Sequence, residues 1–182
     1  MKFLTAKTAI ALTAILFLAG CSATTTKTAT PTPSPSSTNP YGGGFKVNPP
    51  KATDVVLTVT GTSSHAYTMG ELTSLATKTI TIFEPFLKTR QSFAVVSMTS
   101  LLNKGGFSRD QKIETLALND YAFVDTAANF IDNNAYIAVS RSGADIPMDQ
   151  GGPVRIVFED SSPYAKNLDA WNWSLKAIGP SK

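Results

Sequence analysis

The most specific segment of this chain is Gln150-Gly151-Gly152-Pro153-Val154-Arg155, which leads directly into the apolar run over residues 154–158. Two adjacent glycines permit backbone angles and close approaches that a side chain would forbid. Pro153 then fixes one backbone angle ahead of a run that is rich in β-branched residues. The segment therefore predicts a tight turn that feeds a strand, and a tight turn alone would explain the two glycines in most folds.

Strands predominate along the rest of the folded part. Apolar runs predict strands over residues 54–61, 79–83, 113–118, 121–124, 135–140, 154–158 and 171–178. The last run predicts a half-buried strand, because four apolar side chains alternate with three polar ones: Trp171, Trp173, Leu175 and Ala177 against Asn172, Ser174 and Lys176. Several strands follow one another without a helix between them. This order favours a mixed, strand-rich α+β domain over a doubly wound one.

Short helices are predicted where capping residues precede apolar residues. Thr68 and Glu71 have the spacing of a capping box, at the start of a helix that runs to residue 76. Ser97 is a candidate N-cap for a second helix, over residues 98–104, whose end is marked by Gly105-Gly106. Two further local signals are a helical segment of one or two turns over residues 126–131 and a tight hairpin turn at Asn119-Asp120.

The order of these segments resembles the molybdopterin-binding domain of the sulfite oxidase superfamily. The segments that carry the resemblance are residues 97–107 (SMTSLLNKGGF), 113–121, 135–138 (AYIA), 145–157 (DIPMDQGGPVRIV) and 171–173 (WNW). The matching family features are an sLL..aG helix, a strand that closes on a DGY-like turn, a strand that ends in alanine, a GGP.R.v segment and a closing Trp-containing strand. The match covers most of residues 55–178. It implies a sulfite-oxidase-like fold and, in catalytic members, oxidoreductase chemistry with a molybdopterin cofactor.

The chain departs from this family at the metal. Catalytic members ligate molybdenum through a cysteine thiolate in the segment that here spans residues 79–88, and no cysteine stands there. The nearest carboxylate is Glu84, and a hard oxygen ligand is a poor substitute for a soft thiolate. Arg90 and Arg155 have the chemistry to bind a phosphate, although the favoured interpretation of each is a surface or ion-paired arginine. The cofactor-site candidates that the resemblance implies are Glu84, Arg90, Gly151, Gly152 and Arg155.

Other catalytic constellations find little support. One histidine and one cysteine exclude His-rich and Cys-rich metal sites, so we predict no metal site. His65 would have to serve in a Ser-His-Asp triad, but no Gly-x-Ser-x-Gly elbow exists, and we interpret it as a turn histidine. Trp171 and Trp173 are compatible with a ligand cleft, but core packing is the favoured interpretation. The carboxylates of Asp120 and Asp125 are interpreted as solvated loop groups, and no catalytic residue is assigned.

The N-terminus has the layout of an export signal. Residues 1–20 comprise a lysine-containing start and an uncharged apolar run over residues 8–18, which is too short to span a bilayer. The run ends in Leu18-Ala19-Gly20-Cys21, which resembles the lipobox of bacterial lipoproteins. The resemblance implies cleavage before Cys21, a diacylglyceryl group on its sulfur, and acylation with chains such as palmitate. The alternative is an ordinary secretory leader that leaves Cys21 as a free thiol.

A change in composition separates this anchor from the folded domain. Residues 21–52 are rich in Thr, Ser, Pro and Gly and are predicted to form a disordered stalk, which would span on the order of 30 Å as a flexible chain. The predicted globular domain is residues 53–182. The formal charge of +3 comes from 16 basic and 13 acidic residues. Five of the basic residues precede residue 53, so the domain holds 11 against 13, a net charge of −2. The domain therefore gives no argument for nucleic acid as a partner.

These observations lead to one functional expectation and one alternative. We expect a lipoprotein held through acylated Cys21 at the extracytoplasmic face of a cell membrane, with no cofactor and with a non-catalytic domain that binds a small ligand or an envelope protein. The alternative is a molybdopterin-dependent oxidoreductase with atypical metal ligation.

Overall fold

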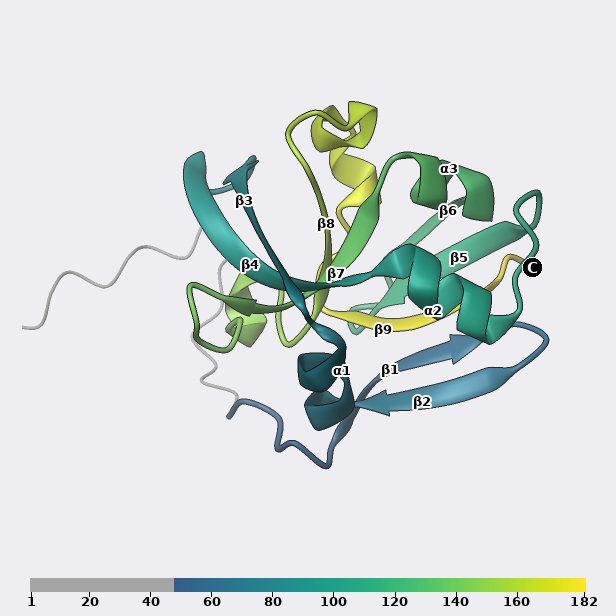
Figure 1. The fold of residues 1–182 in the computed structure, drawn as a ribbon, viewed down its shortest axis with the longest axis horizontal. Helices are drawn as coiled ribbons and strands as arrows, with labels where there is room; N and C mark the ends of the chain where they lie inside the picture. The colour runs from purple at the N-terminus through teal and green to yellow at the C-terminus, as the bar shows by residue number, and fades with distance from the viewer. Residues whose placement is uncertain (1–47) are drawn as a thin grey trace, which may run out of the picture. The chain divides into compact units, whose positions relative to one another are not determined.

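The computed structural model describes residues 48–182. The predicted leader, Cys21 and the stalk up to residue 47 lie outside the described residues. Two sheets form the framework of the described part (Figure 1). No helix within residues 48–182 has the length and apolar character needed to cross a bilayer.

One sheet has five strands in the order β2-β1-β9-β5-β6. Its strands are β1 (Val55–Thr60), β2 (Ser64–Thr68), β5 (Lys112–Ala117), β6 (Ala122–Thr126) and β9 (Leu175–Pro180). The second sheet has four antiparallel strands in the order β3-β4-β7-β8. Its strands are β3 (Lys78–Glu84), β4 (Thr89–Ser97), β7 (Ala135–Arg141) and β8 (Arg155–Phe158). Among the paired strands of the described region, β1 and β9 alone run parallel, so the mixed α+β prediction is confirmed and a doubly wound sheet is not formed.

Three short α-helices connect the sheets. They are α1 (Met69–Leu75), α2 (Met98–Gly105) and α3 (Ala127–Asp132), and three single-turn 3-10 helices lie at Met148–Gln150, Pro163–Lys166 and Leu168–Ala170. The helices α1 and α2 each contact strands of both sheets, α1 through β2 and β4 and α2 through β1 and β4 (Figure 1). Their apolar faces join a single core with the inner faces of the sheets; at its centre lie Leu57, Leu72, Phe93, Leu101, Ile113, Ile137 and Ile156.

Most local signals act as predicted. The capping box is present: the Thr68 hydroxyl accepts from the Glu71 amide, and the Glu71 carboxylate accepts from the Thr68 amide at 2.8 Å. Gly106 ends α2 with a positive φ of 72°, and Asp120 takes a positive φ of 65° in the hairpin between β5 and β6. The N-cap prediction for Ser97 is wrong in one respect, because Ser97 stands at the N-cap position but its side chain makes no capping hydrogen bond.

Two strands were not predicted, and one prediction was too long. The sequence pattern missed β2 and β4, and β2 contains His65, which is therefore a strand residue and not a turn residue. The strand predicted over residues 171–178 begins only at Leu175. Ser174 has a positive φ of 48°, which breaks the extended conformation. Asn172, predicted on a polar face, is fully buried, and its amide donates to the Thr115 carbonyl at 2.7 Å.

The last residues of the predicted stalk are attached to the domain. The Ala52 carbonyl accepts from the Gly70 amide at 2.9 Å, and the Asp54 carbonyl accepts from the Met69 amide at 3.0 Å. A Cβ atom at Gly70 would lie 2.9 Å from the Ala52 oxygen, so the close approach requires glycine here. Both donors belong to the first turn of α1, where amides lack partners within the helix. The segment before β1 is therefore built into the start of α1.

Candidate functional site

The predicted cofactor segment contains a buried ion pair. Glu84 is the last residue of β3 and Arg155 the first residue of β8, at opposite edges of the four-stranded sheet. The Arg155 Nη2 atom donates to Glu84 Oε1 at 2.9 Å. The exposed fractions of the two side chains are 2% for Arg155 and 0% for Glu84. The two charges therefore neutralise each other in the core.

Further atoms of this pair also have hydrogen-bond partners among the described residues. The second carboxylate oxygen of Glu84 accepts from the amides of Phe86 at 3.0 Å and Leu87 at 2.5 Å, which closes the turn after β3. The Nη1 atom of Arg155 donates to the Gln150 carbonyl at 3.3 Å. The indole of Trp173 covers the guanidinium, with 4.1 Å between the ring centroid and Cζ. The arginine is thus held by a carboxylate, a carbonyl and an aromatic face.

The two glycines of the specific segment serve the packing of this pair. Gly151 has a φ of 89°, and a Cβ atom there would lie 2.9 Å from the Trp173 ring. A Cβ atom at Gly152 would lie 1.8 Å from the Ile146 carbonyl oxygen. The glycines let the turn approach Trp173 and the preceding loop. This close packing keeps Trp173 against Arg155 and leaves no space for a ligand at the two glycines.

The last of the five cofactor candidates, Arg90, lies apart on the surface of β4. Its Nη1 atom donates to Asp160 Oδ2 at 2.8 Å, and its Nη2 atom donates to the Thr81 carbonyl at 2.9 Å. The pKa of Asp160 is lowered, first by a hydrogen bond from the Phe83 amide and then by Arg90. The residues that the resemblance implies therefore do not fit a molybdopterin phosphate: the buried arginine is ion-paired with Glu84, and the exposed one is ion-paired with Asp160.

The tryptophans line a shallow hollow on the outer side of this pair. The hollow has a volume of about 250 Å³ and is lined by Phe86, Ala117, Asn119, Tyr121, Leu168, Asp169, Trp171 and Trp173. Trp171 is buried, and its indole donates to the Tyr164 carbonyl at 3.0 Å. Core packing therefore holds for Trp171, while Trp173 is half-buried between Arg155 and the hollow.

The carboxylates of Asp120 and Asp125 do not form a pair. Asp120 accepts from Lys176 Nζ at 2.6 Å. Asp125 accepts from the hydroxyl of Tyr164 and from Asn129 Nδ2. Burial, followed by the bond to Asp125, raises the pKa of Tyr164 to about 12. The interpretation of Asp125 as a merely solvated group is therefore wrong, because it fixes the start of α3 to the segment that contains Tyr164.

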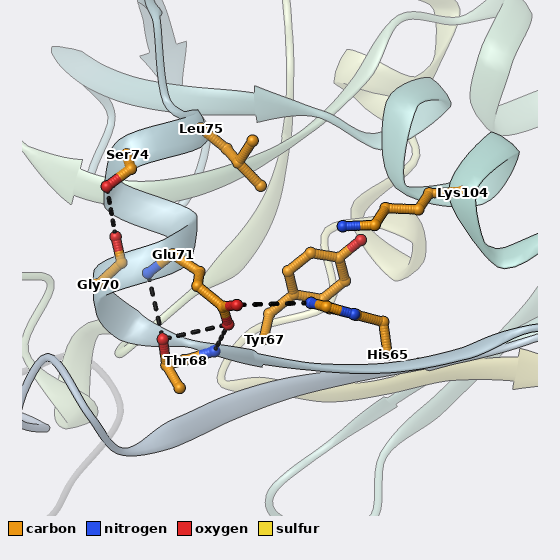
Figure 2. Close-up of a pocket in the computed structure, with 8 residues that line it drawn as sticks. All are labelled: His65, Tyr67, Thr68, Gly70, Glu71, Ser74, Leu75 and Lys104. Atoms are coloured by element: carbon orange, nitrogen blue, oxygen red, sulfur yellow. Dashed lines mark hydrogen bonds and ion pairs between the residues drawn. The ribbon is translucent and has the colours of Figure 1, made fainter.

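A larger hollow lies between β2, α1 and α2, and we call it the Tyr67 groove. It has a volume of about 440 Å³ and is lined by His65, Tyr67, Thr68, Gly70, Glu71, Ser74, Leu75 and Lys104 (Figure 2). The alternation of β2 places His65 and Tyr67 on one face, with 4.2 Å between their ring centroids. The lining combines an aromatic floor, an aliphatic side chain at Leu75 and charged groups from two helices.

Acidic and basic groups stand at opposite ends of this groove. Glu71 lies at the α1 end, where its carboxylate serves the capping box and lies 3.6 Å from His65 Nε2 (Figure 2). The pKa of Glu71 is lowered, and the largest cause is the hydrogen bond from the Thr68 amide. Lys104 reaches in from α2, with its Nζ atom 5.3 Å from the Tyr67 ring centroid (Figure 2). No carboxylate within residues 48–182 forms an ion pair with Lys104.

Tyr67 is the most constrained residue of the groove. Its side chain is 1% exposed, and its hydroxyl has no hydrogen-bond partner among the described residues. Burial raises its pKa, with a further contribution from Glu71. Sequence reasoning did not single out Tyr67 or Lys104. The alternation of His65 and Tyr67 on a strand was the available signal, and it was obscured by the polar residues around it.

Comparison with known proteins identifies no relative. A scan against protein-family models finds no match, and a search of curated proteins finds none either. Within residues 48–182, no three His, Cys, Asp or Glu side chains come together in a group that could hold a metal ion. The geometry of the ion pair and of the Tyr67 groove therefore carries the functional argument.

Proposed function

We propose that this chain is a lipid-anchored extracytoplasmic protein whose sulfite-oxidase-like domain binds a small ligand in the Tyr67 groove and has no molybdenum chemistry. The observation that supports the proposal best is the buried pair of Glu84 and Arg155. In the family that the sequence resembles, this part of the domain serves the cofactor. Here its arginine and its carboxylate satisfy each other.

Energetics favour retention of the ion pair. For Arg155 to bind a cofactor phosphate, it would have to leave Glu84, and the carboxylate would then be buried without its cation. Breaking a buried pair in this way costs about 3–5 kcal/mol. The packing of Trp173 against the guanidinium adds to that cost. A molybdopterin enzyme with Glu84 as its metal ligand would have to meet both costs.

The Tyr67 groove has the features of a small-molecule site. Such sites combine an apolar lining with a few polar groups of defined position. The groove offers the Tyr67 ring and Leu75 as apolar surface. Its polar groups are Lys104, which has no carboxylate partner among residues 48–182, and the Tyr67 hydroxyl, which has no hydrogen-bond partner there. A small ligand accounts for these features more directly than a protein partner does, because the polar groups converge in a concave site.

Metal analysis tests the absence of molybdenum chemistry. The full chain is to be expressed in a host that makes molybdenum cofactor, purified from membranes, and measured for molybdenum and released pterin. We expect less than one-tenth of an equivalent, and stoichiometric molybdenum would overturn the proposal. A variant with Glu84→Cys is a useful comparison, since it restores a thiolate at the segment where the family has one.

Mass spectrometry of the mature N-terminus tests the anchor. We expect the chain to begin at Cys21 and to carry the mass of a diacylglyceryl group with one or more further acyl chains. Cys21→Ser should abolish the added mass and the cleavage together. A chain cleaved before Cys21 with an unmodified thiol would show that the leader is an ordinary secretory signal.

A further inference from the structure

The Tyr67 hydroxyl is a buried donor that has no hydrogen-bond partner within residues 48–182. A buried polar group without a partner costs about 1–3 kcal/mol, so proteins seldom keep one without a reason. The hydroxyl points away from β2 toward the Lys104 end of the groove (Figure 2). The residue lines the groove with its ring, and an acceptor that enters at this end would reach the covered hydroxyl once the exposed side chain of Lys104 moves off the ring.

Lys104 supplies a second donor and a positive charge at the same end. It stands on the last turn of α2, and its ammonium lies over the Tyr67 ring. The carboxylate of Glu71 at the other end already accepts from the amide and the hydroxyl of Thr68 and faces His65. The positive end of the groove is therefore available to an anion, while the negative end is occupied by the capping box.

A second hollow continues beyond these residues. It has a volume of about 200 Å³ and is lined by Tyr67, Leu75, Thr77, Lys78, Val95, Val96, Ser97, Ser100, Leu101 and Lys104. Tyr67, Leu75 and Lys104 line both hollows and so form the partition between them. Leu75 is 45% exposed and leaves aliphatic surface at the partition. The ammonium of Lys78 does not compete with Lys104 for an anion, because it is paired with Glu159 at 2.7 Å.

We propose that the Tyr67 groove binds an aliphatic carboxylate, whose oxygens accept from the Tyr67 hydroxyl and Lys104 Nζ and whose alkyl chain lies across Leu75 in the second hollow. This inference rests on the proposed function and names its ligand class. One carboxylate group satisfies the two donors at once, and a charged acceptor makes the stronger hydrogen bond with each. The alkyl chain would cover the exposed part of the Leu75 side chain at the partition.

The probe for this inference is hexanoate, compared with acetate and with the neutral analogue hexanamide. The full lipidated chain is placed in phosphatidylcholine nanodiscs, affinity is measured by calorimetry against empty nanodiscs, and position is measured by NMR of ¹³Cζ-labelled tyrosine. We expect saturable binding of hexanoate that shifts the Tyr67 resonance. Hexanamide should bind at least ten-fold more weakly because it lacks the charge, and acetate at least ten-fold more weakly because it lacks the chain.

Matched variants locate the two donors. Lys104→Gln should weaken hexanoate binding about ten-fold, while Lys112→Gln, on the exposed face of β5, should leave it unchanged. Tyr67→Phe should weaken it about five-fold, while Tyr121→Phe, which removes a hydroxyl bonded to the Asp169 carbonyl, should not. Equal effects of Lys104→Gln and Lys112→Gln, or hexanamide binding as tight as hexanoate, would overturn the inference.

The two proposals fail in different ways. Molybdenum bound to the purified chain would overturn the proposed function whatever hexanoate does. A molybdenum-free chain that shows no saturable shift of the Tyr67 resonance with hexanoate would overturn the carboxylate site alone, and would leave the groove to a ligand of other chemistry.

Discussion

At the scale of single residues, the proposed absence of molybdenum chemistry rests on the pair of Glu84 and Arg155. Arginine and carboxylate are both common at phosphate and metal sites, so the sequence alone assigns them to a cofactor as readily as to each other. Only the structure shows that they pair with each other, because the two residues are 71 positions apart in the chain. They meet only when the four-stranded sheet has formed.

Removal of the Arg155 guanidinium should destabilise the domain, because it leaves the Glu84 carboxylate buried without a counter-charge. Arg155→Met should lower the free energy of unfolding by about 3–5 kcal/mol, because Glu84 stays buried without a counter-charge. The double variant Glu84→Gln with Arg155→Met should lose less unfolding free energy than the two single variants lose together. Urea unfolding followed by tryptophan fluorescence measures both. A loss below about 1 kcal/mol for Arg155→Met would mean that the pair is not closed as described.

The Tyr67 hydroxyl gives the opposite expectation in the absence of ligand. Tyr67→Phe should leave stability unchanged or raise it by about 1 kcal/mol, since it removes a buried donor that has no partner among the described residues. Tyr121→Phe is the control, and it should lose about 0.5–1.5 kcal/mol with its bond to the Asp169 carbonyl. Urea unfolding of both variants gives the comparison. A destabilised Tyr67→Phe would show that the hydroxyl already has a partner in the free protein.

At the scale of elements, the capping box of α1 links a local sequence signal to the wall of the groove. The Glu71 carboxylate accepts from the Thr68 amide, and its pKa lies below the ordinary value of 4.5. A carboxyl with a lowered pKa in the folded state contributes stability above its ordinary pKa and loses it as the pH falls through the folded value.

Substitution of Glu71 should therefore change how the stability of the domain depends on pH below neutrality. Between pH 7 and about 5, Glu71→Gln should unfold at lower urea concentration than the wild type, and the difference should shrink as the pH falls below about 4.5. Glu114→Gln, on β5 and without a helix to cap, is the control. A difference that stays constant down to pH 3 would mean that the charge of Glu71 does not act through the cap.

The turn before β8 provides a second test at this scale. Gly151→Ala should lower the free energy of unfolding by about 2 kcal/mol or more. The alanine would be strained by the positive φ, and its Cβ would lie 2.9 Å from the Trp173 ring. Gly143 has a similar φ of 78°, and no atom lies within 4 Å of a Cβ placed there. Gly143→Ala should therefore lower the free energy of unfolding by only about 1 kcal/mol, through backbone strain alone. Urea unfolding compares the two variants. Equal losses would show that Trp173 gives way to the added methyl group.

Local signals predicted most helices and strands but missed β2 and β4, and the candidate site depends on contacts between residues that are remote in sequence. The capping box at Thr68, the glycine end of α2 and the hairpin at Asp120 depend on neighbouring residues, so the sequence could predict them. The buried amide of Asn172 was assigned to a polar face, because its partner Thr115 is remote in sequence. The Tyr67 groove could not be predicted for the same reason: its walls come from β2, α1 and α2, and only the fold brings Lys104 to Tyr67.

At the scale of the whole molecule, the boundary between stalk and domain lies earlier than composition suggests. Residues 51–54 form hydrogen bonds to the first turn of α1 and to each other. A domain that starts at residue 55 should therefore be less stable than one that starts at residue 48, by about 1–3 kcal/mol for the two lost acceptors of Met69 and Gly70. Thermal unfolding of the two chains measures this, and equal midpoints would place the boundary at residue 55.

The attachment of residues 52 and 54 to α1 also has a mechanical consequence. With Cys21 in the membrane as proposed, a pull on the chain ahead of residue 48 reaches the domain first through the carbonyls of Ala52 and Asp54. Both carbonyls are held by amides of α1, the helix that also carries Glu71 and Leu75 into the Tyr67 groove. Tension between the membrane and a fixed domain would therefore load the wall of the binding groove before it loaded either sheet.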